Sequence, residues 1–273
     1  MADNHPSISV CTISGAESGR IGRALASVQD WTLERIVVLN EEVQDGTEQI
    51  ALQLGARIYR EPWKGYIAQK NSAAVKAKGE WILDLDADEA VSDALREEIL
   101  RTISDPALAS AATAFSFPRL SWYCGRWIRH GDWYPDRTIR LWRKGKARWG
   151  GVDPHAVLKV DGTISRMRAD LLHFSRESIN VHLGKLAHFS DEFVRQHKGK
   201  NAVPGVFDLA VRPLWRFIRA YILRLGFLDG WPGYYIAAHT SFSTLLRYAK
   251  LREARLPSRP QSAGSDAPKY RQR

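Results

Sequence analysis

The chain has 273 residues, of which 44% are hydrophobic, so it is long enough for one large domain or for one domain with an appendage. Its net charge of +10 is uneven, because residues 195–273 contain 15 Lys and Arg but only 4 Asp and Glu. Cys11 and Cys124 are its only cysteines, which argues against a disulfide framework or a structural zinc site and for a reducing compartment. We expect no secretory signal and, without an apolar run of about 18 residues, no transmembrane helix.

The first 90 residues alternate between strand and helix patterns. Strands are predicted over residues 8–13, 35–39, 56–59 and 81–85, and helices over residues 21–28, 48–54 and 67–77. Strand starts that lie about 20–30 residues apart are typical of βαβ units, so the sequence predicts a mostly parallel, doubly wound α/β sheet. Ligands of such sheets bind at the carboxyl ends of the strands, near a switch in strand order.

An acidic run, Asp84-Leu-Asp-Ala-Asp-Glu89, follows the fourth predicted strand. Alternate residues of a strand share a face, so its three aspartates are expected to converge. Neighbouring carboxylates repel one another unless a cation or protons intervene, and Mg²⁺ binds both carboxylate and phosphate oxygens. We therefore predict a metal–diphosphate site with Asp86 and Asp88 as the ligands and Asp84 near the nucleotide. The alternative is a solvated acidic turn before a helix that starts near Ser92.

After residue 107 the pattern changes to short strand candidates separated by Gly and Pro. They cover residues 112–117, 122–128, 138–142 and 156–160, and a helix is predicted over residues 178–197. This part is rich in Trp and favours an antiparallel extension of the sheet that builds an acceptor pocket.

Residues 204–256 are predicted to be helical and basic, with a break at residues 226–230 and a second helix over residues 236–251. The apolar residues at helical spacing are Leu214, Trp215, Ile218, Tyr221, Ile222 and Leu225, and the residues of another face are Arg212, Arg216 and Arg219. Such an amphipathic helix suits an anionic membrane surface. The alternatives are nucleic-acid binding, for which no recognised motif is present, and an apolar core with solvated arginines.

The acidic run, together with Asp45-Gly-Thr47 and Gln69-Lys-Asn71, resembles the family 2 inverting glycosyltransferases. Later motifs resemble the branch that adds a sugar to the inner core of lipopolysaccharide. They are Trp133-Tyr-Pro-Asp136, Arg140-Leu-Trp-Arg143, Pro154-His155 and Gly226-Phe-Leu-Asp-Gly-Trp231. The resemblance extends over most of the chain, from about Ile8 to Leu251.

This resemblance implies a GT-A fold, a nucleotide-diphosphate sugar donor and a divalent cation, Mg²⁺ or Mn²⁺, on Asp88 with Asp86 nearby. The cation offsets the charge that builds on the departing diphosphate. A general base deprotonates the acceptor hydroxyl, whose attack inverts the anomeric centre. The donor-binding set is expected to be Ser14, Asn40, Asp45, Lys70, Asn71, Asp84, Asp86 and Arg140.

Two positions depart from the family pattern. Asn40 stands where the family usually has an aspartate after the second strand, and its amide remains able to hydrogen-bond a uracil edge. Ala156 follows His155 where an acidic residue is common, which removes one candidate base. Asp153 is then the nearest substitute, with Asp136 as the second candidate, and either residue is equally compatible with capping a turn beside proline.

The other site candidates have equally open alternatives. Lys70 and Asn71 suit a donor contact or a solvated helix face, and Arg140 or Arg143 suits a diphosphate contact or an ordinary surface pair. His130, Trp133 and His155 are candidates for the acceptor site. His173 is expected to be structural.

We thus predict a GT-A glycosyltransferase domain (1–200), a basic, amphipathic, membrane-associating helical extension (201–256) and a disordered tail (257–273). The expected function is transfer of a hexose from a nucleotide-diphosphate sugar to a lipid-linked saccharide. The resemblance of the later motifs implies that this saccharide is lipopolysaccharide core. The expected location is cytoplasmic, peripheral on the inner membrane. The alternatives are transfer to a polyprenyl phosphate and a non-catalytic basic protein that binds membranes or nucleic acid, of which nucleic acid is the less favoured partner.

Overall fold

In a computed structural model, the structure describes residues 7–153, 155–174, 178–197 and 203–256. The first third alternates strands and helices, as predicted, with small shifts at the ends of the elements. These elements are β1 (Ile8–Ser14), α1 (Ile21–Ala26), β2 (Glu34–Asn40), α2 (Thr47–Gln53), β3 (Arg57–Glu61), α3 (Tyr66–Lys76) and β4 (Trp81–Asp84).

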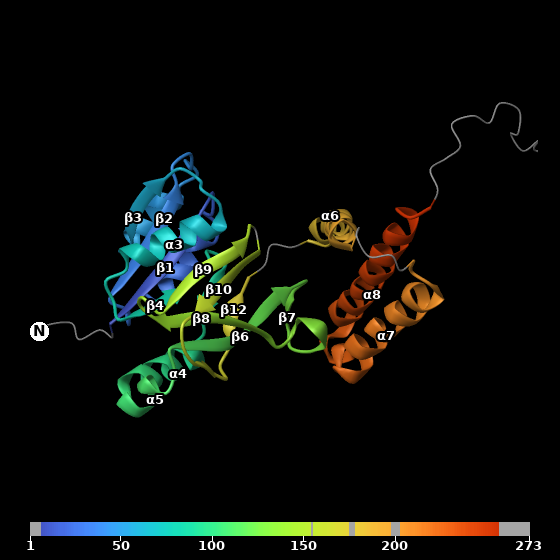
Figure 1. Cartoon of the computed structure of the whole chain (residues 1–273). Coiled ribbons are helices and arrows are strands. Elements are labelled where there is room, and N and C mark those ends of the chain that lie inside the picture. Colours follow the sequence, from blue (N-terminus) through green and yellow to red (C-terminus); the bar gives the residue numbers. More distant parts are fainter. Residues whose placement is uncertain (1–6, 154, 175–177, 198–202, 257–273) are drawn as a thin grey trace, which may run out of the picture.

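The four strands form a parallel sheet in the order β3-β2-β1-β4, and the sheet continues through β8, β6, β12 and β5 (Figure 1). The added elements are β5 (Glu89–Val91), α4 (Asp93–Ser104), α5 (Pro106–Ser110), β6 (Ala114–Tyr123), β7 (Arg126–Ile128), η1 (Gly131–Trp133), β8 (Asp136–Arg143), β11 (Ile164–Arg166) and β12 (Leu171–His173). Strand β8 pairs antiparallel with both β4 and β6. The predicted GT-A-like, mostly parallel sheet with an antiparallel extension is therefore confirmed.

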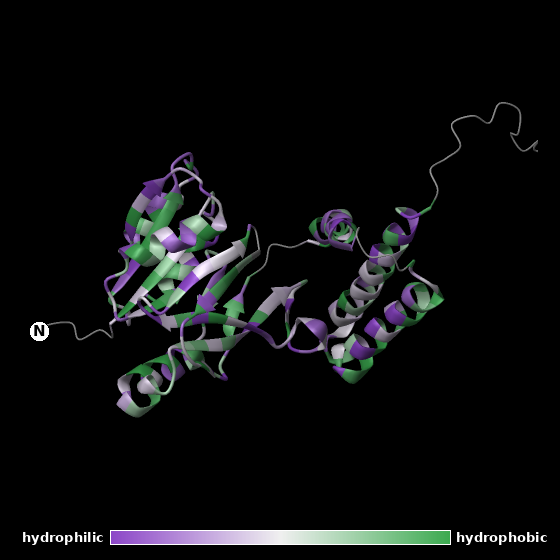
Figure 2. Ribbon diagram, in the orientation of Figure 1, coloured by the Kyte–Doolittle hydropathy of each residue, from purple (hydrophilic) through white to green (hydrophobic). Residues whose placement is uncertain are grey.

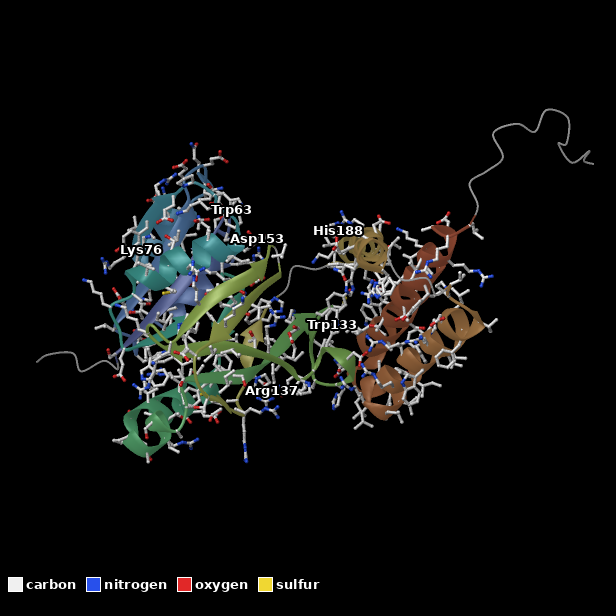
Figure 3. The ribbon with its side chains drawn as sticks, in the orientation of Figure 1. Trp63, Lys76, Trp133, Arg137, Asp153 and His188 are labelled. Atoms are coloured by element: carbon white, nitrogen blue, oxygen red, sulfur yellow. The ribbon has the colours of Figure 1, made fainter. Side chains whose placement is uncertain are left out.

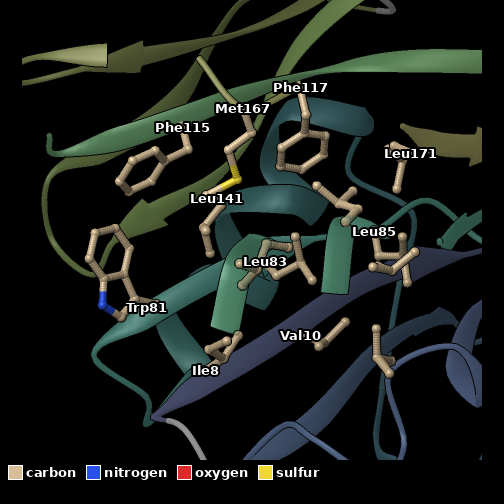
Figure 4. Packing of buried hydrophobic residues seen from close by; sticks show 14 of the residues in the cluster. Ile8, Val10, Trp81, Leu83, Leu85, Phe115, Phe117, Leu141, Met167 and Leu171 are labelled. Atoms are coloured by element: carbon tan, nitrogen blue, oxygen red, sulfur yellow. The ribbon is translucent and has the colours of Figure 1, made fainter. Parts of the chain in front are cut away.

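Both faces of the central strands are buried. On one face, Ile8, Val10 and Leu83 pack with Phe115 and Leu141 (Figure 4). On the other face, the cluster comprises Cys11, Ile36, Val38, Ala73, Ala77, Ile82, Ala114, Trp142, Trp149 and Leu158. Burial on both sides explains why these strands are apolar without alternation. Each fully buried aliphatic side chain contributes about 1.5–3 kcal/mol to folding, so this core fixes the strand ends that carry the site.

The extension differs from its prediction at the hairpin of β6 and β7 and at four strands, β5, β9, β11 and β12, that were not predicted. The strand predicted over residues 122–128 is a hairpin, in which β6 and β7 pair around a turn with positive φ at Cys124 (46°) and Gly125 (84°). Strand β9 (Ala147–Val152) was not predicted and pairs with β10 (His155–Val160) in a separate two-stranded sheet. Trp149 of β9 covers the sheet face next to α3, so β9 is defined by tertiary packing as much as by its own pattern.

The C-terminal part is helical, as predicted. It comprises α6 (Ile179–His197), the π-helical turns η2 (Phe207–Val211) and η3 (Arg219–Leu223) on either side of α7 (Arg212–Ile218), the 3₁₀ turn η4 (Gly226–Asp229), and α8 (Gly230–Glu253). The predicted break falls on η4, but α8 begins directly after it rather than at residue 236. Gly233 permits this, because a Cβ there would lie 1.9 Å from the Gly226 carbonyl oxygen.

Helices α7 and α8 lie side by side beyond the β7 end of the sheet (Figure 1). Helix α6 packs on α8, where Lys250 Nζ lies 2.7 Å from a carboxylate oxygen of Asp191. The predicted boundary at residue 200 stays a prediction, and the predicted tail, 257–273, lies outside the described residues. In the described parts of the chain, every helix is too short or too polar to cross a bilayer.

Candidate active site

A cavity of about 860 Å³ opens at the carboxyl ends of β1, β2 and β4. Strand β1 pairs with both β2 and β4, so the chain switches direction across the sheet at this edge. The cavity is lined by Ile13, Ser14, Gly15, Glu17, Asn40, Trp63, Tyr66, Lys70, Asp86, Ala87, Asp88, Arg119, Asp136, Arg137, Thr138, Arg140, Trp149 and Ala156. The predicted location of the ligand site at a strand-order switch thus coincides with this cavity.

The acidic run begins where β4 ends, and two cations meet its carboxylates. Lys70 Nζ lies 2.6 Å from Asp84 Oδ2 and 2.6 Å from Asp86 Oδ1. Arg140 donates to Asp84 and Asp86 and, at 2.8 Å, to Glu89 Oε1. Arg140 and Lys70 are only 5% and 7% exposed, so neither is part of a solvated surface pair or helix face. Lys70 and Arg140 therefore offset much of the repulsion between these carboxylates, which a metal ion was expected to offset.

The network shifts the pKa values of its members in opposite directions. Burial alone raises the pKa of Asp86, but Arg140 and Lys70 outweigh it and hold that pKa far below its usual range. Burial raises the pKa of Glu89, and Arg140 only partly opposes this. The pKa of Lys70 rises despite burial because of Asp84 and Asp86. Asp86 and Lys70 are therefore both charged at neutral pH.

Asp88 lies apart from this network and faces a histidine. Its Oδ2 is 3.5 Å from His173 Nε2 and 3.2 Å from Arg20 Nη1. Burial raises the pKa of Asp88, but the hydrogen bond from His173 outweighs it and lowers the pKa. His173 Nδ1 lies 3.1 Å from Ser121 Oγ, a contact that orients the ring. His173 was expected to be structural. The pairing of β12 with β5, which joins residues far apart in the sequence, brings it next to Asp88.

The described residues contain no ready-made cluster of three His, Cys, Asp or Glu side chains for a metal. Asp88 and His173 nevertheless form a two-ligand set of oxygen and nitrogen, and the ring is oriented from behind by Ser121. This set fits a divalent cation that takes its other ligands from phosphate oxygens and water. Asp86, the other predicted ligand, has its carboxylate oxygens engaged by Lys70 and Arg140.

The predicted donor residues divide into two groups. Ser14 and Asn40 line the cavity. Asp45 instead accepts hydrogen bonds from Thr47 N at 3.0 Å and Ser18 N at 3.1 Å, and the Thr47 contact lowers its pKa to about 2. Asn71 forms two 3.0 Å hydrogen bonds with the backbone of Trp149 and so ties α3 to β9. Asp45 and Asn71 therefore support the walls of the cavity without lining it.

The two candidate bases are also separated by the structure. Asp153 Oδ1 accepts a 3.0 Å hydrogen bond from Ile67 N and caps the first turn of α3 (Figure 3). Asp136 lines the cavity with a side chain that is 47% exposed, and Arg119 Nη2 holds its Oδ2 at 2.6 Å. Asp136 is thus the candidate base that faces the cavity. Trp63 and Tyr66, which were not among the predicted site residues, line the same cavity as an edge-to-face pair with ring centroids 4.9 Å apart.

The predicted acceptor residues lie toward the helical part. Asp229, the aspartate of the Gly-Phe-Leu-Asp-Gly motif, contacts His130 Nδ1 at 3.0 Å and accepts from His130 N at 2.8 Å. Trp133 packs against Tyr123 with ring centroids 5.0 Å apart, away from Trp63 and Asp153 (Figure 3). His130 and Trp133 therefore join η1 to the helices and do not line the cavity. His155 begins β10, and its side chain lies outside the described part of the structure.

Comparisons with known proteins show which family the chain resembles. Residues 9–158 match the sequence profile described as Glycosyl transferase family 2. An uncharacterised glycosyltransferase of Rickettsia typhi is 31% identical over 92% of this chain and 89% of its own length. The lipopolysaccharide core biosynthesis glycosyltransferase LpsC of Rhizobium meliloti is 25% identical over 85% of this chain and 90% of its own length.

Among solved structures, TarS residues 1–349 of S. aureus in complex with UDP aligns with a TM-score of 0.47 and 14% identity. The alignment covers 90% of each chain.

Proposed function

This chain belongs to glycosyl transferase family 2 and is a glycosyltransferase, and we propose that it transfers a hexose from a nucleotide-diphosphate sugar to a lipid-linked saccharide with inversion. The observation that carries the proposal is that Asp88, which lines the cavity, faces His173 and lies near the buried Lys70–Arg140 network. The site thus offers a candidate cation position beside fixed positive charge, a combination that suits a diphosphate.

Asp88 and His173 would hold the divalent cation, Mg²⁺ or Mn²⁺. When bound, the cation offsets the negative charge of the departing nucleoside diphosphate. Asp86 stays a candidate ligand from the sequence, but its pairing with Lys70 and Arg140 favours a different task. It keeps these two cations in place beneath the site, where their charge acts on the leaving diphosphate.

Asp136 is the better supported candidate for the general base. Its carboxylate faces the cavity and is oriented by Arg119, whereas Asp153 is engaged by the amide of Ile67. The base would take the proton of the acceptor hydroxyl as that oxygen attacks the anomeric carbon. Ser14 and Asn40 line the cavity at the strand ends and would contact the nucleotide.

The lipid-linked acceptor rests on the likeness to LpsC, whose name places it in lipopolysaccharide core biosynthesis. We propose a lipopolysaccharide core acceptor and a position on the cytoplasmic face of the inner membrane. A polyprenyl phosphate acceptor is the competing possibility, and it is tested by offering both acceptors with the same donor.

The activity is tested by release of nucleoside diphosphate from a panel of nucleotide sugars with Mg²⁺ or Mn²⁺. We expect Asp88→Asn and His173→Gln to lower turnover by about 100-fold or more and to raise the metal concentration needed for half-maximal rate. Asp136→Asn should lower turnover by about 10²–10⁴-fold and leave binding of donor and metal intact.

Asp161→Asn is the matched control, since this carboxylate is 88% exposed on the β10–β11 turn and does not line the cavity. If the wild-type protein releases no nucleoside diphosphate from any donor, the proposed reaction is wrong. If Asp88→Asn titrates with metal like the wild type, the metal assignment is wrong even though the reaction stands.

A further inference from the structure

The C-terminal helices expose large apolar side chains on the side that faces away from the protein. Leu214, Trp215 and Leu223 are 59%, 53% and 58% exposed, whereas Pro213 and Ala220 of the same segment are buried. Hydrophobic positions recur along α7 and into the turn that leads to α8 (Figure 2). Several large apolar side chains exposed on one short segment are a feature of interaction sites.

Arg212, Arg216 and Arg219, the predicted cationic face, are all paired with carboxylates of the protein. Arg219 Nη2 lies 2.7 Å from Asp132, and Arg224 and Arg216 approach the same carboxylate at 3.4 and 3.7 Å. Arg212 pairs with Asp208 at 2.7 Å. The pairs with Asp132 direct three of these arginines toward η1. The large apolar side chains of the same segment remain exposed to solvent.

Further positive charge, only loosely paired, lies beside η4 at one end of this apolar segment. A hollow of about 560 Å³ lies between β7 and the start of α8, and Arg126, Arg129, Trp127 and Trp231 line it. The side chain of Arg129 is 57% exposed, and its nearest carboxylate, on Asp170, is 3.9 Å away. Two more exposed apolar side chains, Phe227 (42%) and Leu228 (50%) of η4, shortly precede Trp231 in the chain.

We propose that this face docks on the surface of an anionic phospholipid bilayer. Leu214, Trp215 and Leu223 would enter the boundary between headgroups and acyl chains, and Arg126 and Arg129 would contact lipid phosphates. Tryptophan beside arginine is suited to that depth, because its ring is apolar and its N–H seeks a polar partner. The role of this contact rests on the proposed function, since it brings the cavity to a lipid-linked acceptor.

The charge of the region favours a bilayer over a second copy of the chain. Residues 195–273 carry 15 basic and 4 acidic residues, so two such faces in contact would bring like charge together. An anionic bilayer neutralises the same charge and covers the apolar side chains. The described helices are too short or too polar to span a bilayer, and the proposed contact is with the bilayer surface.

The test is co-sedimentation of the full chain with vesicles of phosphatidylglycerol mixed into phosphatidylcholine, without donor or acceptor. We expect Trp215→Glu/Leu223→Glu to lower the partition coefficient at least about tenfold, and Arg129→Gln to lower it about fivefold. Val75→Glu/Val157→Glu, which adds the same two charges at apolar positions that are 81% and 58% exposed on α3 and β10, and Arg148→Gln on β9 should bind like the wild type.

Hydrogen exchange of the wild type provides a measurement that does not depend on folding of a variant. Vesicles should protect the amides of residues 206–231. The proposal is overturned if this protection is absent, or if Trp215→Glu/Leu223→Glu binds vesicles normally. It is also overturned if the wild type is a dimer without vesicle affinity, since a second copy then covers the face. Vesicle binding needs no turnover, so these results are independent of the reaction assay.

Discussion

Two clusters of arginine and carboxylate differ in how their charge is balanced. At the end of β4, Arg140 is almost fully buried and shares its guanidinium among Asp84, Asp86 and Glu89. Beside the C-terminal helices the ratio is reversed, because Arg216, Arg219 and Arg224 gather around the single carboxylate of Asp132.

The difference shows two uses of the same chemistry. A buried guanidinium with several carboxylates must be matched, because an uncompensated charge in the interior is costly. A half-exposed cluster tolerates an excess of positive charge, since water and counterions screen it. The first arrangement fixes the geometry of a site, and the second leaves positive potential at the surface. The following substitutions test this contrast.

The largest effect is expected for Arg140→Met. It takes the shared guanidinium away from the buried carboxylates of Asp84 and Glu89 and from the partly exposed carboxylate of Asp86, so the free energy of unfolding should fall by about 3–5 kcal/mol. Arg143→Met, three residues further along β8, removes an ion pair with the half-exposed Glu80 and should cost about 1 kcal/mol or less. Urea unfolding of both variants measures the difference. Equal losses would show that burial does not distinguish the two arginines.

A smaller effect is expected for Asp132→Asn in the helical cluster. The carboxylate is 9% exposed, and its loss leaves three neighbouring guanidinium groups without an anion. We expect a loss of about 2 kcal/mol, visible as faster amide exchange in α7 and η3. Asp208→Asn, which removes one exposed pair with Arg212, should cost about 0.5 kcal/mol. If Asp132→Asn is as mild as Asp208→Asn, the cluster is only a surface feature.

The smallest effect concerns acid stability at the end of β3, where a carboxylate is paired with two lysines. Burial raises the pKa of Glu61, but hydrogen bonds from Lys64, Lys76 and Ser72 outweigh this and lower it from 4.5 to about 2. Because the folded pKa is the lower one, Glu61 stabilises the protein above about pH 4.5, and this contribution disappears as the pH falls toward 2.

The free energy of unfolding of Glu61→Gln should therefore fall by about 1 kcal/mol less than that of the wild type between pH 6 and pH 3, as measured by urea unfolding. Glu97→Gln, at an exposed position of α4, should follow the wild type. The opposite sign, with the variant more sensitive to acid, would contradict the pairing of Glu61 with its lysines.

The first four strands and their helices were predictable because their signals are local. Apolar runs, glycine stops and regular spacing define them, and the acidic run follows β4 as expected. The hairpin of β6 and β7 was missed because its turn depends on positive φ at Cys124 and Gly125, and no pattern marked Cys124 for that conformation. Strand β9 was missed because its strand state depends on packing of Trp149 against the sheet.

The sequence by itself determined the fold class, the family and the position of the carboxylates, since each depends on residues that are neighbours in the chain. Only the tertiary structure decided which charges meet. Lys70 and Arg140 reach Asp84 from different elements, and His173 reaches Asp88 through the pairing of β12 with β5. It also placed Asp136 on the cavity wall and Asp153 at the start of α3, and it turned the arginines of α7 and η3 toward Asp132. Electrostatic interactions act through space over a few ångströms, so the partners of a charge are set by the folded chain and not by its sequence neighbours.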